Sequence, residues 1–264
     1  MIVAAVGTLV VGGRPFVLFW LCAAVAIVWE WQNLLHIGRP RARFVVGAVS
    51  VAIAGACGAQ LFPEIGLGVL IVGALAVGFI AERGMKIWAG AGVVYAGALI
   101  LAICALKPPV PVAIETPLTT LSIVWLFAVV WGTDIMAYFG GRLIGGPKLW
   151  PRVSAGKTWS GTLVGVASGA IFGLLVARSG AKEEIAIVPV LLVGLCAAAL
   201  SQAGDLLESS VKRRFGVKDS SRLIPGHGGV MDRLDGFIAA AVFAALLGAA
   251  RGWPAVAEGL FQWR

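Results

Sequence analysis

The sequence predicts an all-α, polytopic membrane protein, built as a bundle of about nine transmembrane helices. Hydrophobic residues make up 59% of its 264 residues and charged residues only 13%, whereas soluble domains hold roughly 45–50% and 25%. The mean hydropathy is +0.95, and long apolar runs alternate with short polar segments. A chain of this composition could not dissolve as an ordinary globule.

The length suits one integral-membrane domain over residues 1–264, because spans of about 20 residues with short loops leave no room for a separate soluble unit. We expect N-terminal transmembrane helices over residues 1–117. Residues 118–264 are expected to form a catalytic transmembrane half with cytoplasmic loops. The 36 glycines are typical of helices that pack closely in lipid.

The apolar runs predict the individual helices in order. Ile2–Val11 is too short to cross about 30 Å of hydrocarbon, so it is either a partial span or the remnant of a longer one. Gly12-Gly13-Arg14-Pro15 then breaks the chain. We expect the remaining spans at residues 16–35, 44–61, 66–81, 87–106, 119–140, 160–177, 185–203 and 237–250.

Glu30 lies inside the span at 16–35, between Trp29 and Trp31. A carboxylate within a span is a functional candidate by default. Its aromatic neighbours, however, are typical of an interfacial belt. Both interpretations stay open.

Loops rich in Lys and Arg alternate along the chain with acidic, neutral or balanced loops. The positive-inside rule places the basic loops in the cytoplasm, so the N-terminus is expected inside and the C-terminus outside. The prediction is a multi-pass protein of the cell inner (plasma) membrane whose active site lies at the cytoplasmic mouth of the bundle.

The net charge of +8 does not indicate a nucleic-acid partner, because basic and aromatic residues do not interleave on a soluble face. Cys22, Cys57, Cys104 and Cys196 are scattered singly through apolar runs. They are best explained as small buried hydrophobic residues, with neither a disulfide framework nor a zinc site.

The longest polar segment runs from Gly204 to Asp235. If residues 200–214 are helical, Asp205, Ser209 and Lys212 share one face. That face would combine a carboxylate, a hydroxyl and an ammonium group, which suits metal and phosphate binding. Glu208 and Arg214 are expected to be simply solvated charges at the helix end.

Asp232 and Asp235 stand one helical turn apart at the end of this segment. With Asp205 they could bind Mg²⁺, alone or with a second cation, since Mg²⁺ takes one or two protein carboxylates and completes its shell with water and phosphate. Arg233 faces another way and could clamp phosphate. The glycines around His227 would let backbone amides face an anion, although a lone histidine in a turn is more often structural.

A second polar segment holds Asp134, Tyr138, Arg142, Lys148 and residues 154–159. Its Gly156-Lys157-Thr158 is not a P-loop, because Pro151 stands where that motif needs glycine. Lys157 remains a candidate anion ligand. Carboxylates for a divalent metal and several cations at a membrane surface favour phosphoryl or nucleotidyl transfer to a lipid.

The run S-x-V-K-R-x-x-x-x-K-D-x-S-x-x-I-P-x-H-G-G-V-x-D-R-L-D, from Ser209 to Asp235, resembles the signature of the phosphatidate cytidylyltransferase (CDP-diacylglycerol synthase) family. Gly204-Asp205-Leu206 and D-x-x-A-Y-x-x-G-R at residues 134–142 also resemble that family. A motif of this length is far more specific than a lone G-x-G-x-x-G. The resemblance covers roughly the C-terminal half, and the N-terminal half is similar only in hydropathy and number of spans.

The resemblance implies transfer of CMP from CTP to phosphatidate, which gives CDP-diacylglycerol and pyrophosphate in phospholipid biosynthesis. The phosphatidate phosphate would attack the α-phosphorus directly, without a protein nucleophile. Asp205 and Asp232 are similar to the family's metal ligands, with Asp235 in support, and a homodimer is implied. The implied phosphate ligands are Lys212, Arg213, Lys218, Arg222 and Arg233, and Ser209 with the His227-Gly228-Gly229 turn would line the nucleotide end.

The chain departs from the family in one motif. Ser154-Ala155-Gly156-Lys157-Thr158-Trp159-Ser160-Gly161 stands where S-P-K-K-T-x-E-G is usual, so one lysine and the glutamate are missing. The alternatives to the cytidylyltransferase are a related membrane nucleotidyltransferase or lipid kinase acting on another lipid phosphate or polyprenol, and more remotely an anion transporter.

Overall fold

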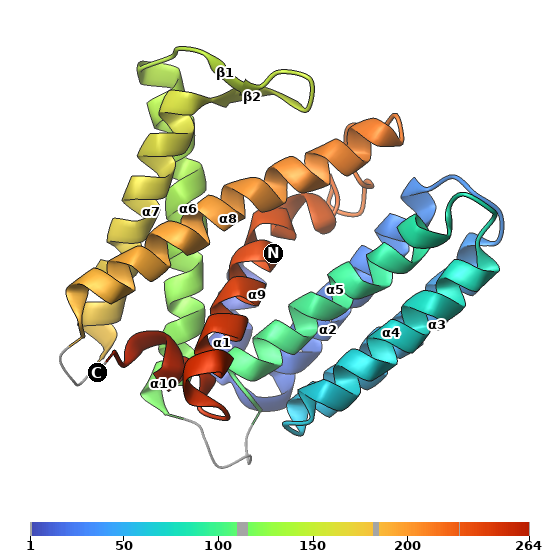
Figure 1. The fold of residues 1–264 in the computed structure, drawn as a ribbon, viewed down its shortest axis with the longest axis horizontal. Coiled ribbons are helices and arrows are strands. Elements are labelled where there is room, and N and C mark those ends of the chain that lie inside the picture. The colour runs from blue at the N-terminus through green and yellow to red at the C-terminus, as the bar shows by residue number, and fades with distance from the viewer. Residues whose placement is uncertain (1, 110–115, 182–184, 227, 264) are drawn as a thin grey trace. The chain divides into compact units, whose positions relative to one another are not determined.

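The computed structural model describes residues 2–109, 116–181, 185–226 and 228–263 of the chain. Helices dominate it (Figure 1), together with one small antiparallel hairpin. In chain order the elements are α1 (Ile2–Val11), α2 (Gly13–Leu34), α3 (Pro40–Ala59), α4 (Pro63–Ile80), α5 (Lys86–Leu106), α6 (Pro117–Leu143), β1 (Lys148–Trp150), β2 (Ser154–Thr158), α7 (Trp159–Gly180), α8 (Ile187–Arg214), α9 (Met231–Gly252) and α10 (Val256–Phe261).

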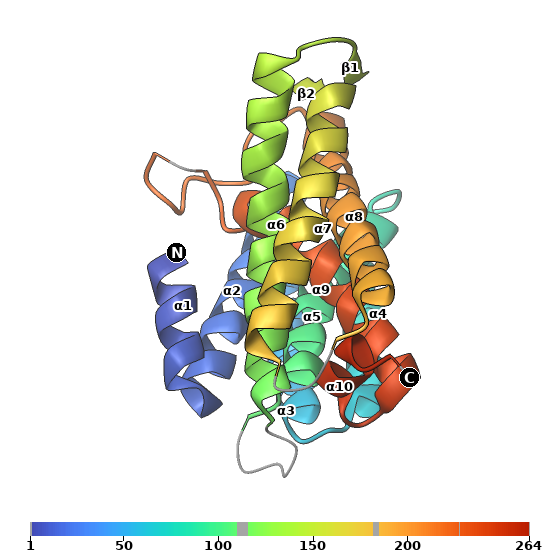
Figure 2. The ribbon, with the colours of Figure 1, turned by 90° about the vertical axis from the view of Figure 1, so that its left-hand side faces the viewer.

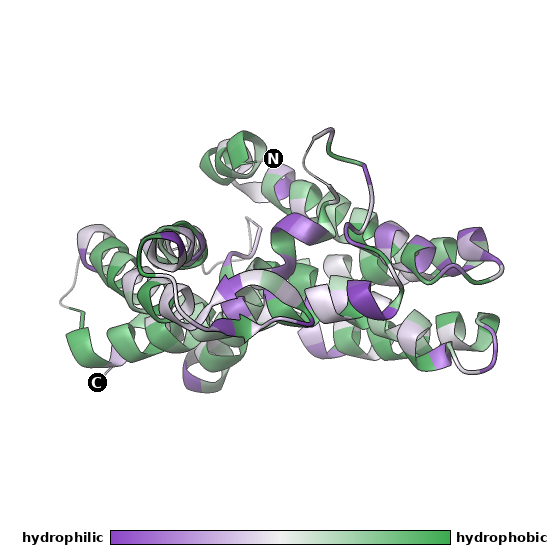
Figure 3. Cartoon of the chain, turned by 90° about the horizontal axis from the view of Figure 1, so that it is seen from above, coloured by the Kyte–Doolittle hydropathy of each residue, from purple (hydrophilic) through white to green (hydrophobic). Residues whose placement is uncertain are grey.

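The predicted membrane bundle is confirmed. Within the described residues, 8 helices, α2 to α9, are long and apolar enough to cross a membrane. Hydrophobic residues run along most of their length (Figure 3). Ile2–Val11 forms a separate helix of 10 residues, so the count of about nine holds only if this short helix is included.

α8 extends well beyond its predicted end at residue 203, whereas α6 ends at Leu143, close to its predicted end at residue 140. α6 has 27 residues and α8 has 28, whereas about 20 residues cross the hydrocarbon. The excess turns are polar but lack a helix breaker, because Asp134 to Leu143 and Gly204 to Arg214 contain no proline. The polar residues 204–214 therefore continue α8, as the interpretation of residues 200–214 as a helix required, and Asp134 lies on α6 within the span predicted at 119–140. The hairpin and the short α10 were not predicted.

The chain divides into two compact units. The first unit comprises Met1–Glu115 with Asp219–Asp232, and the second unit comprises Thr116–Lys218 with Arg233–Arg264. The predicted boundary near residue 117 is close to the first division, but the segment 219–232 groups with the N-terminal helices. The expectation of a single domain stays a prediction.

In the first unit, α2 packs against α3 and α5, and α3 and α4 form an antiparallel pair (Figure 1). Arg43 of α3 is fully buried and donates from Nε to Gln32 Oε1 over 3.0 Å and from Nη2 to the Gln32 carbonyl over 3.0 Å. Glu82 Oε1 accepts the Gly38 amide over 3.0 Å, which joins the α2–α3 and α4–α5 loops. The basic residues of these two loops therefore lie at one end of the unit.

In the second unit, α6 and α7 lie side by side along their length, with the hairpin joining them at one end (Figure 2). Glycines recur every fourth residue on the contacting face of α7, at 161, 165, 169 and 173. A Cβ added at Gly161 would lie 2.6 Å from the Ala137 carbonyl oxygen, and one at Gly165 would lie 2.6 Å from the Thr133 carbonyl oxygen. This spacing lets two helix backbones meet, as small residues do between helices in lipid.

The α6–α7 contact gives a direct test of this packing. Gly165→Ala should lower stability by about 1–3 kcal/mol, because the new methyl group meets backbone that cannot move aside. The measurement is the thermal unfolding midpoint of the detergent-purified protein. Gly68→Ala in α4 is the control, since nothing lies within 4 Å of the Cβ it adds. Equal midpoints for the two variants would contradict the close contact.

Candidate active site

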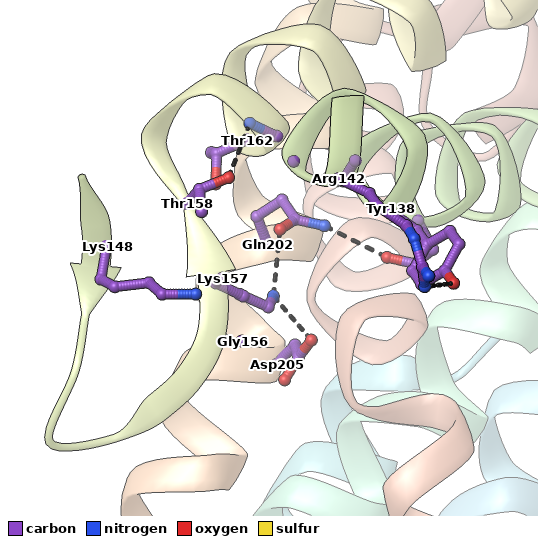
Figure 4. Close-up of a pocket in the computed structure, with 13 residues that line it drawn as sticks. Tyr138, Arg142, Lys148, Gly156, Lys157, Thr158, Thr162, Gln202 and Asp205 are labelled. Atoms are coloured by element: carbon purple, nitrogen blue, oxygen red, sulfur yellow. Dashed lines mark hydrogen bonds and ion pairs between the residues drawn. The ribbon is translucent and has the colours of Figure 1, made fainter. Parts of the chain in front are cut away.

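The second unit contains a pocket of about 550 Å³, a size typical of small-molecule sites. Five elements line it: the C-terminal half of α6, the two strands of the hairpin, the first turn of α7 and the C-terminal part of α8. Three cations, Arg142, Lys148 and Lys157, and two carboxylates, Asp134 and Asp205, belong to its wall (Figure 4). A wall with both signs of charge suits an anion that arrives with a metal ion.

A chain of polar contacts crosses the pocket (Figure 4). Lys157 Nζ lies 2.6 Å from Asp205 Oδ2 and donates to Gln202 Oε1 over 3.0 Å. Gln202 Nε2 donates to Asp134 Oδ1 over 3.1 Å. Side chains from the hairpin, α8 and α6 are thus joined in sequence, and the side chains of Lys157 and Asp205 are 18% and 32% exposed. Both remain accessible to a ligand.

The hairpin places Lys157 through local structure. β1 and β2 pair antiparallel, with Lys148 opposite Thr158 and Trp150 opposite Ser154. Thr158 then caps α7, since its Oγ1 accepts the Gly161 amide over 3.1 Å, as N-cap threonines do. The lysine just before the cap is held at the helix start, where backbone amides and the helix dipole favour an anion.

Ser160 stands at the position where the family motif S-P-K-K-T-x-E-G has glutamate. Its hydroxyl donates to the Gly145 carbonyl and contacts Thr158 Oγ1 at 3.1 Å. Gly145 has φ of 69°, a conformation that glycine adopts readily. Ser160 therefore ties the start of α7 to the turn that follows α6, while a Cβ at Gly156 would meet nothing within 4 Å.

A third carboxylate of the second unit lies near this chain of contacts. Asp235 of α9 interacts electrostatically with both Asp134 and Asp205, and its Oδ1 accepts the Gly236 amide over 2.7 Å. Carboxylates gathered in this way repel one another unless a cation lies among them. Across the part of the chain that the structure describes, no three His, Cys, Asp or Glu side chains form a complete metal-binding set. Mg²⁺ does not need one, because it commonly binds through one or two carboxylates.

The predicted face of α8 is formed in part. Ser209 Oγ donates to Asp205 Oδ1 over 3.3 Å, as their spacing predicted. Lys212 instead lies 2.6 Å from Glu208 Oε2. The expectation that Glu208 is a solvated charge is wrong, because Glu208 is 2% exposed and its burial requires a paired cation. Arg214 is exposed, as predicted.

The other predicted phosphate ligands are more scattered. Arg213 is exposed at the end of α8 and donates to the Val217 carbonyl over 3.2 Å. Lys218, Arg222 and Arg233 are exposed. His227 lies outside the described residues. The binding roles predicted for these residues stay predictions.

Asp232 belongs to the first unit, where it organises the segment 219–232. Its Oδ2 accepts the Gly229 amide over 2.7 Å and the Ser220 hydroxyl over 3.0 Å, and both of its oxygens accept the Ser220 amide, over 3.1 and 3.0 Å. The Gly229 amide, predicted to face a bound anion, is therefore directed at this carboxylate. Gly228, also predicted to line the nucleotide, has φ of 84°.

Gln202 was missed as a site residue, and Asp134, Arg142 and Lys148 were named only as parts of a polar segment and a motif. Gln202 is 4% exposed and links Lys157 to Asp134, although a buried amide within an apolar span is itself a functional signal. Arg142 donates to Tyr138 OH over 2.9 Å. It was recognised only as part of a motif, because sequence spacing could not place α6 beside the hairpin.

The sequence is similar to known proteins over most of its length. A phosphatidate cytidylyltransferase of Brucella abortus is 41% identical over 256 residues, which cover 95% of this chain and 90% of that protein. Its namesake in Pseudomonas aeruginosa is 45% identical over 53% of this chain and 52% of its own length, and that of Staphylococcus saprophyticus is 45% identical over 44% of each. The model of the cytidylyltransferase family matches residues 1–250. The chain belongs to the cytidylyltransferase family.

Proposed function

We propose that the protein is a phosphatidate cytidylyltransferase, which transfers CMP from CTP to phosphatidate and releases pyrophosphate. The single observation that carries this assignment is the pocket at the end of apolar helices in which Lys157 bridges Asp205 and Gln202. A membrane helix bundle suits a lipid substrate, and a pocket wall of cations and carboxylates suits a nucleoside triphosphate. The activity named for the relatives above is the same.

The reaction needs positioning and charge stabilisation more than covalent chemistry. A phosphatidate phosphate oxygen attacks the α-phosphorus of CTP, a new P–O bond forms, and the bond to the bridging oxygen of the β-phosphate breaks, so that pyrophosphate leaves. Such transfers depend on cations held where negative charge spreads in the transition state. Lys157, Lys148 and Arg142 are the pocket cations that serve this purpose.

The donors of the second unit fit Mg²⁺, because Asp205 and Asp235 offer hard carboxylate oxygens beside the phosphate-binding cations. Bound there, Mg²⁺ would neutralise phosphate charge and act as a Lewis acid. Ser209 holds Asp205 through its hydroxyl. The Gly236 amide holds Asp235. The prediction that Asp232 is also a metal ligand is kept as part of this proposal.

We further propose that the pocket faces the cytoplasm, in the inner membrane, and that the enzyme is a homodimer. The orientation rests on the positive-inside rule. Arg39, Arg41, Arg83 and Lys86 lie in or beside the two joined loops of the first unit. In the second unit, Arg142 lies in the last turn of α6, and Lys148 and Arg152 follow that helix. The dimer rests on the family resemblance alone.

The assignment is tested by pyrophosphate release from the detergent-purified protein. Phosphatidate is supplied with each of the four NTPs, with Mg²⁺ and with EDTA. Release is expected only with CTP, phosphatidate and Mg²⁺ together, because the nucleotide needs both the acceptor and the charge neutralisation. Release with another lipid phosphate, or transfer of phosphate to a polyprenol, would move the assignment to a related nucleotidyltransferase or lipid kinase. Ion flux without turnover would indicate a transporter.

Lys157→Met should lower kcat/KM for CTP about 10- to 100-fold, since a charge-assisted contact to phosphate contributes roughly 1.5–3 kcal/mol. Initial rates at varied CTP measure the effect. Arg178→Gln, at the exposed far end of α7, removes the same charge outside the pocket and should leave the rate unchanged. Equal rates for Lys157→Met and the control would rule out Lys157 as a phosphate ligand.

Asp205→Asn should raise the Mg²⁺ concentration needed for half-maximal activity, because an amide oxygen binds the cation more weakly than a carboxylate. The loss of maximal rate is expected to be about 100-fold or more. Rates are measured over a Mg²⁺ titration at saturating CTP, with Glu64→Gln at the exposed start of α4 as the control. An unchanged titration curve would exclude Asp205 from metal binding.

A further inference from the structure

Glu30, in the last turns of α2, holds a segment that lies about two hundred residues further along the chain. Its side chain is 0% exposed. Its Oε1 accepts the Ser221 hydroxyl over 2.6 Å and the Val230 amide over 2.8 Å, and its Oε2 accepts the Met231 amide over 2.7 Å. Every one of these partners belongs to the first unit.

Asp232 makes a matching set of contacts to the neighbouring groups. It accepts the amide and hydroxyl of Ser220 and the amide of Gly229. Glu30 thus accepts from Ser221 and from the amides of residues 230 and 231, whereas Asp232 accepts from Ser220 and from the amide of residue 229. We call this arrangement the carboxylate clasp, formed by Glu30 and Asp232 with Ser220, Ser221 and the amides of residues 229–231.

The clasp determines where α9 begins. The first amides of a helix have no partner within the helix, and α9 starts at Met231. Glu30 supplies the acceptor for two of these donors and places a negative charge at the positive end of the helix dipole. In return, the amides compensate a carboxylate that is fully removed from solvent, which would otherwise be costly.

The close packing around Gly229 is a second observation that supports the clasp. A Cβ added to Gly229 would collide with Ser220 Oγ and with Glu30 Oε1. Only glycine fits between the Glu30 carboxylate and the Ser220 hydroxyl. The clasp thus gives a structural reason for glycine at position 229 of the family signature.

We propose that Glu30 is a positioning residue for the transfer reaction, acting through Asp232 and the start of α9. This inference rests on the proposed function. Asp232 stands in the first turn of α9, so the acceptor that fixes the first amides of that helix also fixes where this carboxylate projects. Arg222 is exposed and directly follows Ser221, whose hydroxyl donates to Glu30. Glu30 is therefore a functional residue of α2 and not simply part of an interfacial belt.

The decisive variant is Glu30→Gln. It keeps the size of the side chain but replaces one carboxylate oxygen with an NH₂ group. This NH₂ group would face the hydroxyl and amide donors that now bind Glu30. Turnover at saturating CTP and phosphatidate should fall about 10-fold or more, with the KM for CTP changed less than about threefold, because the start of α9 loses a charge-assisted acceptor while the pocket cations stay in place. Trypsin should cut the folded protein faster after Lys218 and Arg222, which a purely local loss of stability elsewhere would not cause.

Ser221 provides a graded series in the same clasp. Ser221→Ala removes one bond to Glu30 and should shift turnover and trypsin cleavage in the same direction by a smaller factor. Ser221→Thr keeps the hydroxyl and should restore both. Glu64→Gln is the control for loss of a glutamate charge. If Glu30→Gln does not fold, the alanine and threonine variants of Ser221 decide the question through the same two measurements.

The outcomes separate the two proposals. Faster cleavage together with lower turnover supports the positioning role. Wild-type turnover in Glu30→Gln, or in Ser221→Ala if that variant is the one that folds, overturns it, whether or not cleavage changes. Wild-type protein that is folded yet silent with CTP and phosphatidate overturns the proposed function and, with it, the positioning role.

Discussion

A carboxylate placed among apolar helices must be compensated where it stands, and the polar architecture of this protein follows from that constraint. The chain meets it in three ways. Asp205 is paired with an ammonium group from the hairpin, Glu208 with a lysine one turn further on its own helix, and Glu30 with backbone amides and a hydroxyl. Each solution fixes a different part of the structure: the hairpin, the end of α8 and the start of α9.

Hydropathy was enough to predict the helices but not their ends. The apolar run of α8 stops near Ala203, yet the helix continues to Arg214, whereas α6 ends at Leu143, close to its predicted end at residue 140. Hydropathy reports which residues prefer lipid, whereas a helix continues until its backbone is broken or capped. The extension of α8 matters, because it carries Asp205 on the same rigid helix as Gln202.

The residue types were enough to predict the chemistry of the site, but not which residues contact one another in it. The Lys212 and Glu208 pair is local, at a spacing where ion pairs form on a helix, so the misjudged exposure of Glu208 was avoidable. Lys157 with Gln202, and Glu30 with Val230, join residues 45 and 200 positions apart. No periodicity within a helix encodes such contacts. They depend on which helices pack together. The sequence predicted the number of spans but not their packing order.

Gly156 and Ser160 stand where the family motif usually has lysine and glutamate, and the structure shows what surrounds each of them. Ser160 is not a vacant position, since its hydroxyl holds the start of α7 to the turn after α6. The lysine missing at 156 removes one cation from β2, but Lys148 stands on the paired strand opposite Thr158 and lines the same pocket. With Arg142 from α6 on that wall as well, the positive charge is distributed over three elements. Because phosphate binding depends on the summed field of nearby cations, loss of one lysine from the strand is compatible with triphosphate binding.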